Sequence, residues 1–133
     1  MNMGRYEEAL KTHKECLVIQ ESALGKDHPG YAATLNNIGN TYRNMGRYEE
    51  ALKTYKGCLV IQESALGNDH PDYAATLNNI GNTYRNMGRY EEALKTYKEC
   101  LTIKESELGN DHPDYAATLN NIGNTYHEIG RFQ

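Results

Sequence analysis

Histidine, cysteine, asparagine and arginine, the side chains that could do chemistry here, recur along this chain at a fixed interval of 42 residues. His28, His70 and His112 each precede a proline. A metal site needs several ligands around one centre, whereas equivalent residues in stacked units lie about 10 Å apart. We therefore predict that these histidines are turn or helix-entry residues, and we expect no metal or cofactor.

One cysteine occurs in each repeat, at Cys16, Cys58 and Cys100. This spacing fits neither a disulfide framework nor a Cys-x-x-Cys metal site. The apolar pattern places all three at a small buried position of a helix, where a thiol is packed and inert. Three cysteines without a disulfide pattern indicate a reducing compartment, so we expect a cytoplasmic protein.

A ladder of asparagines with arginine forms the polar face of one helix in each repeat. An asparagine amide offers both donors and acceptors, so it can hold the backbone of an extended peptide. Bonds between asparagines of neighbouring helices, or passive copying by duplication, would also explain the ladder. The candidate peptide-binding residues are Asn36, Asn40, Arg43, Asn78, Asn82, Arg85, Asn120 and Asn124.

The arginines Arg43 and Arg85 lie at the end of their helices, and His127 takes the third position. A guanidinium can bind an acidic side chain or a C-terminal carboxylate through two parallel hydrogen bonds. The alternative is a cation that stabilises the helix dipole. The positive character weakens toward the C-terminus because the third residue is a histidine.

Other classes of function have little support in the sequence. No nucleophile–base pair or glycine-rich phosphate loop stands outside the repeated pattern, so we expect no enzyme. The net charge is −4, which predicts no general affinity for nucleic acid or membrane surfaces. No apolar run approaches the roughly 18 residues of a membrane helix, and Met1 begins no signal-peptide pattern.

The repeat that positions these side chains begins with Gly-Arg-Tyr-Glu-Glu-Ala-Leu-Lys-Thr. A period between about 20 and 50 residues indicates stacked units that each contact mainly their neighbours. We expect one array over 1–133 that resembles a slice of a longer one. Its units are 4–45, 46–87 and 88–129, and 130–133 begins a fourth.

Each repeat contains two amphipathic helices. Apolar residues at steps of three and four run along one face from Tyr73 to Met87, with Pro71 at the start and Gly88 at the end. This segment is helix A. A second apolar face runs through the next 19 or so residues to Gly109, and this segment is helix B. Neither helix can bury its face alone.

We expect Gly81 of helix A to allow a close helix approach, so that Gly81→Leu overpacks the contact by about 1–3 kcal/mol.

This pattern resembles the tetratricopeptide repeat. The matching residues of one unit are Leu77, Ile80, Gly81, Tyr84, Gly88, Tyr90, Ala93, Tyr97 and Cys100. Leucine replaces the usual tryptophan, and the unit has 42 residues instead of 34. Long units with His-Pro-Asp and Leu-Asn-Asn are similar to the kinesin-light-chain branch of the family.

The resemblance implies an all-α fold, a right-handed α-solenoid of six helices in antiparallel pairs. It also implies a non-catalytic adaptor that binds peptides, often acidic ones, in a concave groove lined by helix A. Members that bind chaperone tails use Lys and Arg in that groove, whereas this chain has mostly Asn and Ala there. An acidic chaperone tail is therefore not the expected ligand.

The second hypothesis is structural self-assembly. The first helix B, near Arg5, has no helix A before it in the sequence, and the helix A ending near Ile129 has no helix B after it. The two open ends are complementary, which predicts head-to-tail stacking that does not close.

Overall fold

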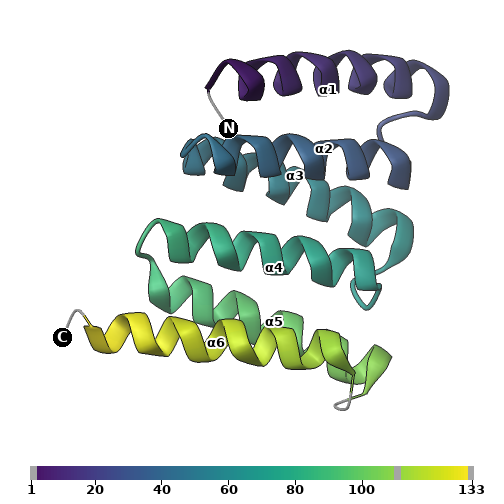
Figure 1. Cartoon of the computed structure of the whole chain (residues 1–133). Helices are drawn as coiled ribbons and strands as arrows, with labels where there is room; N and C mark the ends of the chain where they lie inside the picture. The colour runs from purple at the N-terminus through teal and green to yellow at the C-terminus, as the bar shows by residue number, and fades with distance from the viewer. Residues whose placement is uncertain (1–2, 110–111, 132–133) are drawn as a thin grey trace. The chain divides into compact units, whose positions relative to one another are not determined.

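The computed structural model describes residues 3–109 and 112–131, which form six α-helices and no strand (Figure 1). The helices are α1 (Met3–Leu24), α2 (Pro29–Asn44), α3 (Tyr48–Leu66), α4 (Pro71–Asn86), α5 (Tyr90–Leu108) and α6 (Pro113–Arg131). In the predicted scheme α2, α4 and α6 are helices A, and α1, α3 and α5 are helices B. The predicted all-α fold of six helices is confirmed.

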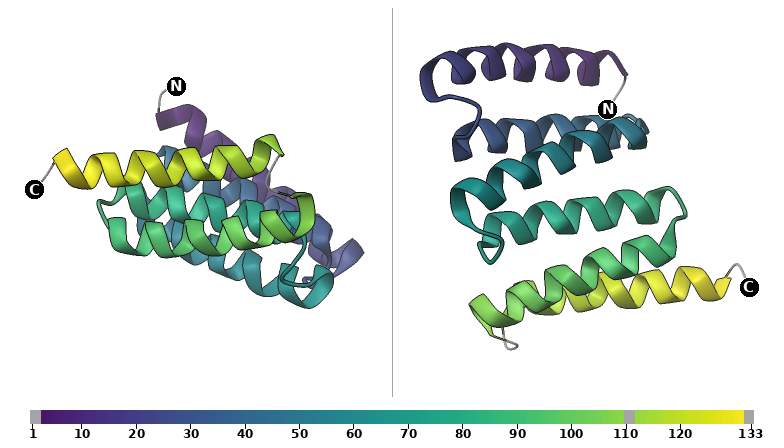
Figure 2. Two further views of the ribbon diagram at one scale, coloured as in Figure 1. Left: turned by 90° about the horizontal axis from the view of Figure 1, so that it is seen from below. Right: turned by 180° about the vertical axis from the view of Figure 1, so that it is seen from behind.

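The chain forms two compact units, Met1–Gly67 and Asn68–Gln133. In the first unit α2 packs against both α1 and α3, and in the second α5 packs against both α4 and α6 (Figure 2). The boundary between the units falls inside the sequence repeat 46–87. The compact units therefore divide the chain at a different point from the 42-residue repeats.

The histidines cap the helices A. The ring Nδ1 of His70 accepts a hydrogen bond from the backbone N–H of Asp72 at 3.0 Å, and Pro71 occupies the first helical turn. His28 and His112 cap α2 and α6 in the same way. A side-chain acceptor at this position satisfies a backbone donor that has no partner within the helix. The predicted role at the helix entry is confirmed.

Glycines in the left-handed region end the helices. Gly88 has a φ of 77°, and the next N–H, of Arg89, bonds back to the carbonyl of Tyr84 at 2.9 Å. This arrangement satisfies a carbonyl left open at the helix end and reverses the chain within a few residues. Gly109 ends α5 with a φ of 84°. Both glycines stand where the sequence predicted helix ends.

The last helix runs further than predicted. The sequence placed its end near Ile129, but α6 continues through Gly130 to Arg131. Gly130 does not adopt the positive φ that ends α2 and α4 at the equivalent glycines. Glu128 replaces the asparagine found in the other copies, and glutamate is the better helix former.

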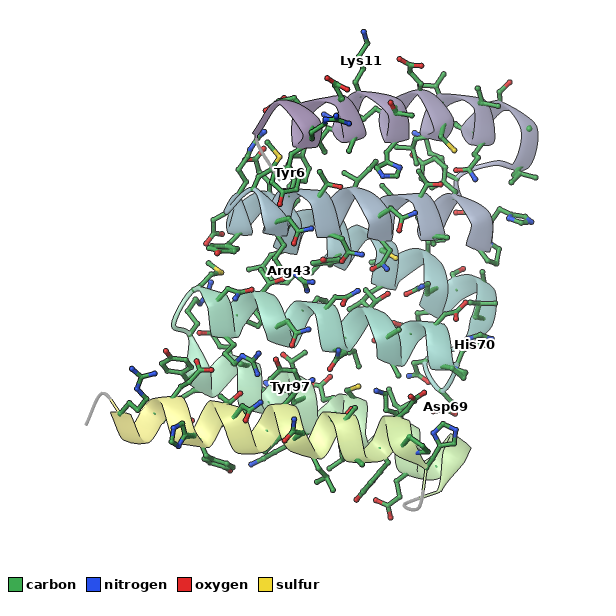
Figure 3. All side chains as sticks on the ribbon, viewed as in Figure 1. Tyr6, Lys11, Arg43, Asp69, His70 and Tyr97 are labelled. Atoms are coloured by element: carbon green, nitrogen blue, oxygen red, sulfur yellow. The ribbon has the colours of Figure 1, made fainter. Side chains whose placement is uncertain are left out.

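Each A–B pair is packed around a tyrosine. Tyr97 of α5 is fully buried, and Figure 3 shows it in the space between α4 and α6. A Cβ added at Gly81 of α4 would lie 2.7 Å from its ring. The equivalent pair in the first unit is Tyr55 and Gly39, at 2.6 Å. The predicted close approach at Gly81 is confirmed, and its partner is the tyrosine ring.

The cysteines do not share one environment. Cys58 and Cys100 are fully buried, and their thiols donate to the carbonyls of Ala32 and Ala74 at 3.2 Å. Cys16 is exposed, so the prediction that all three are buried is wrong for this residue. The reason is the neighbouring helix: Cys58 and Cys100 each face the helix A that precedes them in the chain, and among the described residues no helix precedes α1.

Candidate binding face

The predicted binding residues lie on the polar side of the helices A. Asn36, Asn40 and Arg43 project from α2 and are half-buried. Figure 3 shows Arg43 on the side of α2 that faces away from α1. In the second unit Asn78, Asn82 and Arg85 project from α4 and are half-buried, and Asn120 and Asn124 project from α6 and are exposed.

One asparagine in each A–B pair holds the buried tyrosine. The hydroxyl of Tyr97 donates to Oδ1 of Asn82, and that of Tyr55 donates to Oδ1 of Asn40. Burial raises the pKa of Tyr55 to about 12, so the hydroxyl keeps its proton and remains the donor. Because the amide oxygen is the acceptor, the hydrogen bond also fixes which way each amide points.

A hydrogen bond between two asparagines joins the two helices A of the second unit. Nδ2 of Asn121 on α6 donates to Oδ1 of Asn78 on α4 at 3.0 Å. This is the bond between asparagines of neighbouring helices that the sequence left open as an alternative. Asn78 and Asn82 therefore both use their oxygen within the fold. On these two residues the amide N–H groups have no such bond to a described residue.

The arginines have donors without a partner. Nη1 of Arg43 and Nη1 of Arg85 are buried and make no hydrogen bond within the described part of the chain. Arg85 Nε lies 3.6 Å from a carboxylate oxygen of Glu128 on α6. Burying an unsatisfied guanidinium donor costs stability. Glu128 was not among the predicted site residues. The sequence feature that could have indicated it is the change from Asn86 to Glu128 between copies.

The face also borders a depression of about 240 Å³ in the second unit. Lys104 of α5 lines it and donates to Oγ1 of Thr118 at 2.9 Å. The other copies carry glutamine at this position, and that difference is the only signal the sequence offers. The lining residues are Pro71, Ala74, Ala75, Asn78, Asn79, Ile103, Lys104 and Asp114.

A family model described as Tetratricopeptide repeat matches residues 1–56, 31–106 and 73–133. The chain belongs to the tetratricopeptide repeat family. Tetratricopeptide repeats generally mediate protein–protein interactions, so the coarse function is that of an interaction scaffold.

Solved structures share the fold. A Podosopora anserina putative kinesin light chain with nearly identical TPR-like repeats aligns with a TM-score of 0.82 at 24% identity, and this chain covers 60% of its length. A crystal structure of a single-residue variant of that protein gives the same values. BtubC (BKLC) from P. vanneervenii aligns with a TM-score of 0.85 at 22% identity, with 52% of its length covered. The alignments cover 96% and 98% of this chain, so the tetratricopeptide solenoid fold is confirmed. A search of curated proteins gave no match.

Within the described residues, this tetratricopeptide array has no group of three His, Cys, Asp or Glu side chains that could hold a metal ion. No helix in the described ranges is long and apolar enough to cross a membrane. The polar groups of the face are asparagine amides, which both donate and accept, and guanidinium groups, which only donate.

Proposed function

We propose that the chain is a non-catalytic scaffold that binds an extended, acidic peptide along the Asn/Arg face of its helices A. The observation that carries the proposal is the buried Nη1 of Arg43 and of Arg85, each without an acceptor in the described residues. Both arginine side chains are half-buried, and they would turn outward for a ligand carboxylate to reach these donors and form charge-assisted hydrogen bonds.

The asparagines support the same ligand chemistry. Asn82 and Asn78 accept bonds from within the fold through their oxygens, so their amide N–H groups are left to donate. Peptide carbonyls and carboxylates are acceptors, and an extended backbone presents a carbonyl at every residue. The residues proposed to contact the peptide are Asn36, Asn40, Arg43, Asn78, Asn82, Arg85, Asn120 and Asn124. The three cysteine thiols, which form no disulfide among the described residues, support a reducing compartment such as the cytoplasm.

An immobilised peptide array tests this function. The probe is a set of random-sequence peptides with and without Asp and Glu, and the variant is Arg43→Gln combined with Arg85→Gln. We expect binding of acidic peptides to fall at least about 100-fold, because each of the two charged hydrogen bonds contributes about 1.5–3 kcal/mol.

The matched control is Arg47→Gln combined with Arg89→Gln, which removes the same charge. These arginines lie at the turns, where they pair with Glu50 and Glu92. The control should bind acidic peptides like the unmodified chain. Equal binding by both double variants, or no preference for acidic peptides, would contradict the proposal.

The second candidate function is structural self-assembly, favoured by the exposure of Leu119 and Tyr126 on α6. These apolar side chains lie on a helix face that tetratricopeptide stacking normally covers. Sedimentation velocity across concentration tests this function, and a strictly monomeric chain at high concentration would contradict it.

A further inference from the structure

The apolar face of α6 is open where the same face of α4 is covered. Leu119 and Tyr126 are 47% and 51% exposed, whereas their counterparts Leu77 and Tyr84 are 4% and 9% exposed. The two helices have identical sequences from Pro113 to Tyr126 and from Pro71 to Tyr84. The difference therefore comes from the neighbour that covers α4 and not from the residues.

The structure shows what kind of neighbour fits this face. On α4, the ring of Tyr97 from α5 lies directly over Gly81, and its hydroxyl bonds to Asn82. On α6, a Cβ added at Gly123 would meet no described atom within 4 Å. Asn124, at the position of Asn82, is exposed. The face of α6 thus has space for an aromatic ring, and Asn124 supplies an acceptor beside that space.

Helix α1 has nearly the sequence of the helices that fill this space in the other copies. Residues 6–24 are identical to residues 48–66 of α3, apart from His13 in place of Tyr55 and Glu15 in place of Gly57. In α3 these residues cover α2, whose polar and apolar positions match those of α6. The corresponding side of α1 is open: Cys16 is exposed, while its counterpart Cys58 is fully buried.

We infer that α1 of a second copy of this chain docks on α6 as α5 packs on α4, with the ring of His13 over Gly123 and beside Asn124. The inference rests on the second candidate function, because it names the surfaces through which self-assembly occurs. The two surfaces differ, so each copy uses α6 for one neighbour and α1 for another. Such a contact does not close and builds linear chains.

Cation–π contacts occur at equivalent tyrosines of the two units. In the first unit the ring of Tyr42 has Lys14 at 5.8 Å and Arg47 at 4.8 Å from its centroid. Tyr126 has Lys98 at 5.8 Å, in the position of Lys14. Arg5 of the docked copy holds the sequence position of Arg47, but it lies inside α1 whereas Arg47 lies before α3, so it does not supply the same contact.

Histidine in place of tyrosine makes this contact weaker than the one inside each unit. Its ring is smaller, and it lacks the hydroxyl that reaches the asparagine oxygen. His13→Tyr should therefore strengthen association, and α1 should tolerate it because this side of the helix is open. Gly123→Leu should weaken association, because the equivalent glycine Gly81 has no room even for a Cβ.

Sedimentation velocity and static light scattering of the 133-residue chain, over a wide concentration range, test the contact. We expect the weight-average mass to rise without a plateau. His13→Tyr should lower the dissociation constant at least about tenfold, and Gly123→Leu should raise it at least about tenfold. Asn124→Ala should remove most of the gain in affinity that His13→Tyr produces.

Gly57→Leu is the matched control, because it adds the same side chain outside the proposed contact, where a new Cβ would meet no described atom of another element within 4 Å. Circular dichroism checks that each variant keeps its helical content. A chain that stays monomeric even with His13→Tyr overturns both self-assembly and the contact. If the chain associates with a dissociation constant that neither His13→Tyr nor Gly123→Leu changes, or if association stops at a closed dimer, the contact alone is overturned.

Discussion

At the scale of single residues, a tyrosine ring pressed against a helix glycine decides how closely each A–B pair packs. Gly81→Ala should destabilise the fold by about 1–3 kcal/mol, because the new Cβ would lie 2.7 Å from the fully buried ring of Tyr97. Gly123→Ala changes the equivalent residue of α6, where nothing lies within 4 Å among the described atoms. It should stabilise the fold by about 0.5–1 kcal/mol. Urea unfolding at low protein concentration measures both, and equal effects would contradict the close contact.

The hydroxyl of Tyr55 gives the fold a pH limit. The pKa of Tyr55 is raised to about 12 by burial, above its usual value of about 10. A raised pKa means that the folded chain holds this proton more tightly than the unfolded chain. The resulting stability is complete below about pH 10 and is lost as the pH rises through about 12.

Thermal unfolding followed by circular dichroism from about pH 7 to about pH 11.5 tests this limit. Tyr55→Phe removes the titrating group, so its melting temperature should fall less steeply above about pH 10 than that of the unmodified chain. Parallel curves for the two chains would show that this tyrosine does not control alkaline stability.

At the scale of the elements, a glycine weakens the middle of α3. Gly57 is exposed and corresponds to Glu15 and Glu99 in the other copies. An added Cβ would meet no atom of another element within 4 Å in the part of the chain that the structure describes. Glycine in a helix interior costs up to about 1 kcal/mol relative to alanine. Gly57→Ala should therefore raise the free energy of unfolding by about 0.5–1 kcal/mol, as measured by urea unfolding. No gain would mean that α3 is not helical at this point in solution.

The helices could be predicted from the sequence because their signals are local. Pro71 and Gly88 mark the two ends of α4, and the apolar spacing between them requires no knowledge of neighbours. The bond from Tyr97 to Asn82 could not be predicted, because it joins residues on two helices and depends on how they cross. The exposure of Cys16 likewise depends on which helix lies beside α1. For the candidate binding face the sequence predicts a set of polar positions, but which of their amide atoms bond within the fold depends on contacts between helices.

At the scale of the whole molecule, the reaction rates of the three thiols test how well each of the two compact units is packed. Cys16 is exposed, whereas Cys58 lies buried in the first unit and Cys100 in the second. Burial also raises the pKa of Cys100, which lowers its reactive thiolate fraction. In dilute native protein Cys16 should react with a thiol reagent at least about 100-fold faster than the other two. Mass spectrometry of labelled peptides measures the three rates, and denaturant should make them similar. Three equal rates under native conditions would contradict the buried positions.

The near-identity of the A–B contacts has a consequence for how the chain folds. Because Gly39 and Gly81 lie in the same local sequence, α2 and α4 cannot distinguish α3 from α5 by their tyrosines. The correct partner is selected by the short turn that joins each pair, such as the residues between Asn86 and Tyr90. A tether this short keeps the right helix at a high effective concentration. Refolding should therefore be efficient in dilute solution and should lose yield to exchanged pairings between molecules as the protein concentration rises.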